Sequence, residues 1–173
     1  NFKNFKNIIK IKVVILSILI AFYSRTGRTK KIAELISKSL NCDYEEIVDM
    51  KKRTAFIIGY IKSGRDATKN KLTTIKELQQ NPELYDLIIL GTPSWSSKMP
   101  PAIRTYINNN KSKFKKIAFF CTEIKKGGPE IFESMTNLCD KEPISTLELK
   151  RKEIKGDYHL DKINTFIQEI KSN

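Results

Sequence analysis

Short apolar runs alternate along the chain with segments whose apolar residues recur every three or four positions. The runs read as strands, and they cover residues 13–23, 44–48, 86–91, 116–121 and 144–149. The periodic segments read as helices that bury one face, and they cover residues 29–40, 56–67, 101–107, 131–138 and 160–170. Strands that alternate with helices predict an α/β domain, in which a doubly wound, five-stranded parallel sheet forms the middle of three layers.

The first apolar run has a second interpretation. Residues 13–23 are interrupted only by Ser17 and follow several lysines, which superficially fits a secretory signal peptide. The residues after the run do not supply the small side chains of a cleavage site, and eleven residues are too few to cross a bilayer, which takes about 20. We therefore favour a buried parallel strand. Residues 1–12 are expected to be an extension outside the core, and residues 13–173 a single domain.

In the last periodic segment, five apolar side chains are expected to face the core: Leu160, Ile163, Phe166, Ile167 and Ile170.

Composition narrows the function classes. The chain has 32 Lys and Arg against 19 Asp and Glu, a formal net charge of +13, which favours anionic partners. Cys42, Cys121 and Cys139 are widely spaced and His159 is the only histidine, which argues against a disulfide framework or a zinc site and suggests a reducing cytoplasm. No cysteine is followed by Arg six positions later, so the loop of a cysteine phosphatase is absent.

Three loops should carry the chemistry, because ligands of doubly wound sheets bind outside the carboxyl ends of the strands. The first loop joins a buried strand to a helix start and contains Ser24, Arg25, Thr26, Gly27, Arg28 and Thr29. Hydroxyls, a glycine and the N–H groups of a helix N-terminus together form a cradle for a phosphomonoester. A Walker loop and a dinucleotide-binding GxGxxG are both absent. The alternative is an ordinary turn capped by Thr26 or Thr29.

The second and third loops are candidates for the rest of the ligand. The second contains Thr92, Pro93, Ser94, Trp95 and Ser96, and its indole is well placed to cover an aromatic ring. Trp95 could instead cap the domain surface or an interface. The third contains Thr122, Gly127 and Gly128, whose glycines permit a close backbone approach or form only a turn.

At these residues the sequence resembles the flavodoxin family over nearly all of positions 11–170. The segment YSRTGRT (residues 23–29) is similar to the family's phosphate loop, GTPSW (91–95) looks like its flavin-flanking loop, and residues 53–67 resemble a segment of small flavodoxin-like proteins. The resemblance implies a short-chain flavodoxin-like sheet in the order 2-1-3-4-5 with noncovalently bound FMN. Residues 24–29 would hold the phosphate, residues 92–96 would contact the isoalloxazine, and Thr122, Gly127 and Gly128 would line it.

The implied function is electron transfer through FMN, by a carrier or an FMN-dependent reductase. No side chain is expected to act as a general acid or base. The expected partner is a redox protein with an acidic docking face, and neither a specific nucleic acid nor a membrane span is expected. Two departures stand out: Arg28 replaces the family's common Asn, and no Gly follows Trp95. The alternative is a basic module without redox activity that binds nucleic acid or an anionic surface, although the lysine clusters lack interleaved aromatic residues.

Overall fold

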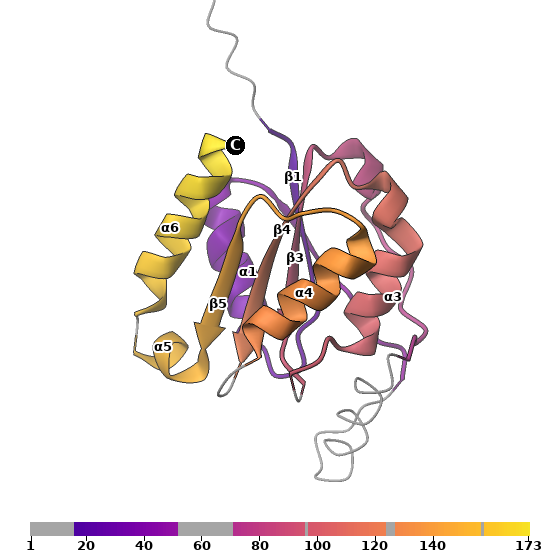
Figure 1. Ribbon diagram of the computed structural model, residues 1–173, viewed down its shortest axis with the longest axis horizontal. Coiled ribbons are helices and arrows are strands. Elements are labelled where there is room, and N and C mark those ends of the chain that lie inside the picture. Colours follow the sequence, from indigo (N-terminus) through magenta and orange to yellow (C-terminus); the bar gives the residue numbers. More distant parts are fainter. Residues whose placement is uncertain (1–15, 52–70, 96, 124–126, 157) are drawn as a thin grey trace, which may run out of the picture.

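A five-stranded parallel sheet in the order β2-β1-β3-β4-β5 forms the middle layer of the protein (Figure 1). The computed structural model describes residues 16–51, 71–95, 97–123, 127–156 and 158–173. Within them the strands are β1 (Ile18–Phe22), β2 (Asp43–Glu46), β3 (Leu87–Pro93), β4 (Lys116–Glu123) and β5 (Thr146–Lys150). The predicted fold class and strand order are therefore confirmed.

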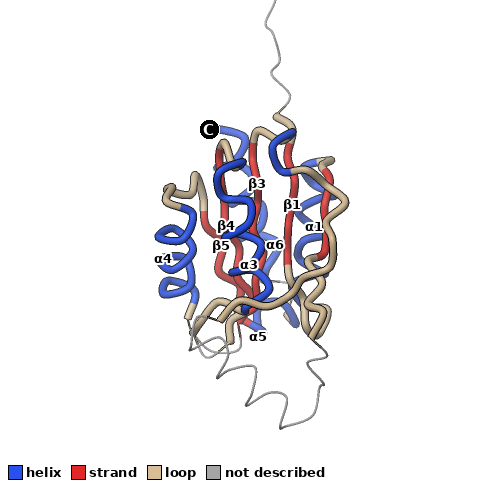
Figure 2. Tube along the Cα trace, turned by 90° about the vertical axis from the view of Figure 1, so that its right-hand side faces the viewer, coloured by secondary structure: helices blue, strands red, loops and turns tan. Residues whose placement is uncertain are grey.

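Helices cover both faces of this sheet (Figures 1 and 2). They are α1 (Arg28–Leu40), α3 (Pro101–Asn110), α4 (Gly128–Cys139), α5 (Arg151–Lys155) and α6 (His159–Ser172), with two short 3-10 turns at Pro82–Leu84 and Lys111–Lys113. Side chains alternate across the strands, so Ile20 and Phe22 of β1 pack with α1 and α6, while Leu19 and Ala21 pack with α3 and α4. The two resulting cores explain the continuous apolar runs in the central strands β1, β3 and β4.

The first strand is shorter than its apolar run. It begins at Ile18, because Ser17 leaves the ladder to bind Asp86: the Ser17 Oγ and backbone N lie 2.8 and 3.1 Å from Asp86 Oδ2. The rest of the predicted run, residues 13–15, lies outside the described residues, as do the extension at 1–12 and the periodic segment at 56–67. No helix in the described part of the chain is long and apolar enough to span a membrane.

Two helix expectations need correction. Leu160 was expected to face the core, but its side chain is 48% exposed. It lies in the first turn of α6 and is not part of the core cluster that contains Ile163, Phe166, Ile167 and Ile170. The short helix α5 was not predicted, because five residues are too few to show a periodicity.

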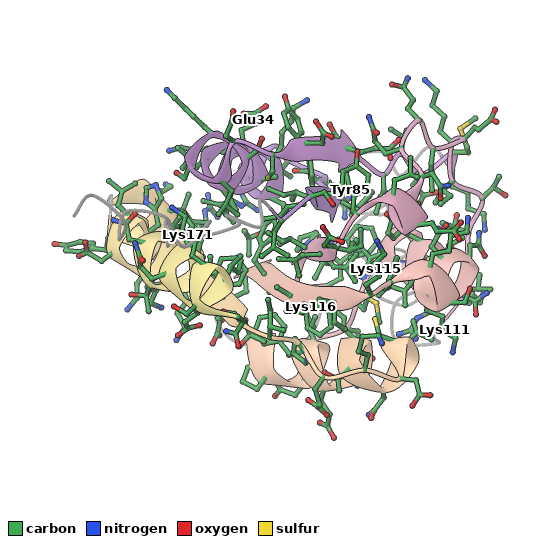
Figure 3. All side chains as sticks on the ribbon, turned by 90° about the horizontal axis from the view of Figure 1, so that it is seen from above. Glu34, Tyr85, Lys111, Lys115, Lys116 and Lys171 are labelled. Atoms are coloured by element: carbon green, nitrogen blue, oxygen red, sulfur yellow. The ribbon has the colours of Figure 1, made fainter. Side chains whose placement is uncertain are left out.

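Several lysines lie at the amino ends of the strands. Figure 3 looks down on this edge and labels Lys111, Lys115, Lys116 and Lys171 there. Lys115 pairs with Asp86 at 3.3 Å, and the Lys116 Nζ donates to the C-terminal Asn173 carbonyl at 2.6 Å. Part of the positive charge is therefore placed at the end of the sheet opposite to the three candidate loops.

Candidate functional site

The three loops predicted to carry the chemistry meet at the carboxyl edge of the sheet. Backbone hydrogen bonds join them: Tyr23 N donates to Gly91 O at 3.0 Å, and Ser94 N donates to Thr122 O at 2.9 Å. The parallel order β1-β3-β4 brings their ends together, although the loops lie far apart in the sequence. The site is therefore assembled by the topology of the sheet.

The first loop forms an open turn at the start of α1. Gly27 has φ +81°, a left-handed conformation that side chains other than glycine rarely adopt, and a Cβ there would meet nothing within 4 Å. Ser24 Oγ accepts the Lys30 N–H at 3.2 Å. Within the described residues, no acceptor is found for the N–H groups of Arg28 and Thr29. These N–H groups and the positive end of the helix dipole come directly after the open turn at Gly27, an arrangement that suits an anion.

The Thr29 side chain has a different role from the one expected. It is 1% exposed, and its Oγ1 lies 2.8 Å from Oγ1 of Thr122, which is also buried. This hydrogen bond braces the first loop against the end of β4. Thr29 can therefore offer an anion its backbone N–H but not its hydroxyl, whereas Thr26 is exposed.

The second loop turns back on itself directly after β3. Trp95 and Lys98 exchange backbone hydrogen bonds of 3.1 and 3.0 Å, and Ser97 adopts φ +57° to close the turn. Thr92 is fully buried and its hydroxyl donates to the Pro93 carbonyl at 3.1 Å, so its side chain supports the loop from below. Ser96 lies outside the described residues.

The Trp95 side chain is packed rather than projecting. Its indole is 7% exposed, contacts the Tyr23 ring edge-on with centroids 5.6 Å apart, and has the Arg25 guanidinium over its face at 5.4 Å. Cation–π and aromatic contacts of this kind hold the ring at the junction of the first two loops. Sequence reasoning placed Trp95 and Arg25 in different roles and missed that they touch.

The third loop packs against the second. Gly127, the residue before α4, has φ +129°, and a Cβ on it would lie 2.8 Å from Ser97 Oγ and 3.0 Å from Ser94 Oγ. Gly128 approaches Glu148 of β5 in the same way, since a Cβ there would lie 2.7 Å from Glu148 Cδ. Both glycines therefore allow the third loop to pack closely, Gly127 against the second loop and Gly128 against β5. Of the two interpretations of this glycine pair, close backbone approach is favoured over a plain turn.

Replacing Gly127 with Ala should destabilise the protein more than replacing Gly27 with Ala. Both residues have positive φ, so both variants carry a backbone cost of about 1–2 kcal/mol. Only Gly127→Ala also pushes against Ser94 and Ser97, which adds about 1–3 kcal/mol of overpacking. Urea unfolding measures the difference, and the fluorescence of Trp95 should shift in the Gly127 variant alone. Equal losses in the two variants would contradict the packing of the third loop on the second.

Beside the third loop, the buried carboxyl group of Glu123 lies next to the half-buried Glu148, and sequence reasoning did not find this pair. Glu123 ends β4, is 4% exposed, and has no hydrogen-bond partner for either carboxyl oxygen among the described residues. The pKa of Glu123 is raised to about 7, first by burial and second by the neighbouring Glu148 carboxyl group. The available signal was an acidic residue directly after a buried apolar strand, in the segment KIAFFCTE.

The fold and the loops define a doubly wound α/β protein with an anion cradle after its first strand. The family model for flavodoxin matches residues 17–170, so the chain belongs to the flavodoxin family, a family of FMN-binding flavoproteins. No curated protein matches the sequence.

Solved structures show the same fold. A flavoprotein of Lactobacillus acidophilus NCFM, crystallised in complex with FMN, is 23% identical and has a TM-score of 0.69, with 82% of this chain and 97% of that chain covered. A protein of Bacteroides eggerthii DSM 20697 is 23% identical with a TM-score of 0.71, covering 86% and 98%. The flavodoxin of Streptococcus pneumoniae TIGR4 is 13% identical with a TM-score of 0.54, covering 90% and 97%.

Proposed function

We propose that this protein binds FMN noncovalently at the three loops and transfers electrons through it. The observation that carries the proposal is the open turn at Gly27, where α1 begins with the N–H groups of Arg28 and Thr29, which have no acceptor in the part of the chain that the structure describes. A phosphomonoester fits this turn, because the helix end supplies donors and a positive potential and Arg28 adds a full charge. The family match and the FMN complex of the L. acidophilus flavoprotein support the same cofactor.

The chain's residues bind and orient the cofactor. The first loop would hold the phosphate through the Ser24 and Thr26 hydroxyls, the Gly27 turn and the start of α1. The second loop would border the isoalloxazine with Ser94 and Trp95, and Gly127 would hold the third loop against it. When bound, FMN supplies the electron chemistry, which the protein adjusts by stacking, hydrogen bonds and charge. Both an electron carrier and an FMN-dependent reductase are compatible with this arrangement. A redox partner with an acidic docking face is also compatible, since Lys98, beside the loops, is exposed.

FMN should bind the apo-protein at least about tenfold more tightly than riboflavin. The two ligands differ by the phosphate, whose charge-assisted hydrogen bonds contribute about 1.5–3 kcal/mol each. Arg28→Ala should weaken FMN binding and leave riboflavin binding unchanged. Fluorescence titration of the full chain with both flavins measures these affinities.

Lys38→Ala is the matched control, because it removes one exposed positive charge from the other end of the same helix. FMN affinity should change little in that variant. Equal affinity for FMN and riboflavin would overturn the phosphate loop. Absence of flavin binding combined with salt-dependent binding to DNA would favour the alternative of a basic module without redox activity.

A further inference from the structure

We propose that Glu123 and Glu148 form a carboxyl pair that holds one exchangeable proton beside the third loop, and that the charge of this pair governs how readily bound FMN is reduced. The first part stands on the chain alone, and the second rests on the proposed function. Glu123 is the last residue of β4 and Glu148 the middle residue of β5, and Gly128 at the start of α4 lies against Glu148.

The two carboxyl groups are held close together by the sheet and by α4. In the register of β4 and β5, Glu148 lies opposite Cys121 and Lys150 opposite Glu123, so all four side chains are on the sheet face that α4 covers. Gly128 presses on Glu148, where a Cβ would lie 3.1 Å from Oε1. Glu123, which is 4% exposed, has no protein donor for either oxygen within the described ranges. A buried carboxyl group such as Glu123 does not ionise readily beside a second carboxylate.

The charges around the pair do not balance two carboxylates. From β5, Lys150 faces Glu123, but it also faces Glu153 of α5. From α6, Lys162 pairs with Glu153 at 2.9 Å and donates to the Glu148 carbonyl, not to its carboxylate. From α4, the nearby Gly128 N–H weakly favours the ionised form of Glu123 although it does not complete a hydrogen bond to it. From β4, the buried Cys121 thiol is neutral, with its pKa raised chiefly by burial. One shared proton compensates for the missing positive charge, which agrees with the raised pKa of Glu123.

A protonated pair carries one negative charge, and a deprotonated pair carries two. The pair lies directly after Thr122, whose carbonyl and hydroxyl are bonded to the second and first loops of the proposed FMN site. Reduction of FMN bound at this site adds negative charge to the flavin. The carboxyl pair repels this charge more strongly when both of its carboxyl groups are ionised. When an external reductant supplies the electrons, the pair should therefore take up a proton from solvent and hold it.

Infrared spectroscopy of the apo-protein tests the first part. We expect the C=O stretch of a protonated carboxyl group at about pH 6, lost as the pH rises through about 7–8 and absent from Glu123→Gln. Glu148→Gln should shift the titration of the remaining carboxyl to lower pH, because one negative neighbour has gone. Glu130→Gln is the control, since it removes an exposed carboxylate from the first turn of α4. Absence of the band in the wild-type protein at about pH 6 would overturn the pair.

Midpoint potentials of the FMN-loaded protein, measured by dithionite titration from about pH 5.5 to 9, test the second part. The potential of the wild-type protein should fall more steeply with pH than that of Glu123→Gln, by up to one proton per two electrons, and Glu130→Gln should keep the wild-type slope. Equal slopes in wild type and Glu123→Gln would overturn the coupling. Failure to bind FMN would overturn the proposed function and the coupling together, while the infrared band would still decide whether the pair holds a proton.

Discussion

Replacing Glu123 with Gln should stabilise the folded protein at about pH 8 by about 2–3 kcal/mol and change its stability very little at about pH 4. The pKa of Glu123 is raised from 4.5 to about 7 in the folded state, chiefly by burial. At low pH the carboxyl group is protonated in both states and costs nothing. As the pH rises from about 4.5 to 7, the unfolded chain ionises more readily than the folded one, so the wild type loses stability over this window at about 1.4 kcal/mol per pH unit.

Gln has the shape of the protonated side chain and does not titrate, so the difference between the two proteins isolates this group. Urea unfolding at several pH values between about 4 and 8 measures it. Glu130→Gln, which alters an exposed carboxylate on the same side of the sheet, should stay within about 0.5 kcal/mol of wild type. A stability difference that is the same at low and high pH would show that the pKa of Glu123 is equal in the folded and unfolded states, so that burial does not govern its charge.

Replacing Gly91 with Ala should cost about 3 kcal/mol of stability, near the upper end of the usual range for an overpacked core. A Cβ on Gly91 would overlap the Phe120 ring at Cζ and lie 2.8 Å from Phe22 Cβ, and both phenylalanines are fully buried in neighbouring strands. Neither ring has free space to move into, so the backbone of β3 must shift. The Gly91 carbonyl also accepts the Tyr23 N–H, so such a shift would disturb the first loop as well.

Gly156→Ala provides the matched control for this overpacking. A Cβ there would meet Tyr158 ring atoms at 3.1 Å, but that ring is 75% exposed and can turn away. Its stability should change by less than about 0.5 kcal/mol. The double variant Gly91→Ala with Phe120→Leu should recover part of the loss, because it removes the ring that the new methyl group meets. Urea unfolding of all three variants measures this, and no recovery in the double variant would mean that Phe120 is not the source of the cost.

Much of the fold was predictable because its strands and helices follow from local patterns of apolar and polar residues. The apolar run around β1, the segment DLIILG and the segment KIAFFC identify strands buried on both faces. The 3.6-residue spacing of Ile32 and Ile36 locates α1 on the sheet. Alternation of these elements predicted the parallel sheet, and the loops at the carboxyl ends of its strands followed from the fold class. Periodicity did not show where each element begins: β1 starts only at Ile18, because the preceding Ser17 binds Asp86, 69 positions away.

For the candidate site too, some features follow from the sequence and others only from the tertiary structure. The amino-acid sequence by itself determined the order of helices and strands, the family, and the three loops, because spacing and residue type are local properties. Tertiary structure alone decided that Thr29 is bonded to Thr122, that Arg25 covers Trp95, and that Glu123 is buried beside Glu148. The partners of these pairs are distant in sequence and meet only when the sheet forms. Whether a hydroxyl is open to a ligand, or a carboxyl group keeps its proton, depends on burial and neighbouring charge, which packing sets and sequence spacing does not reveal.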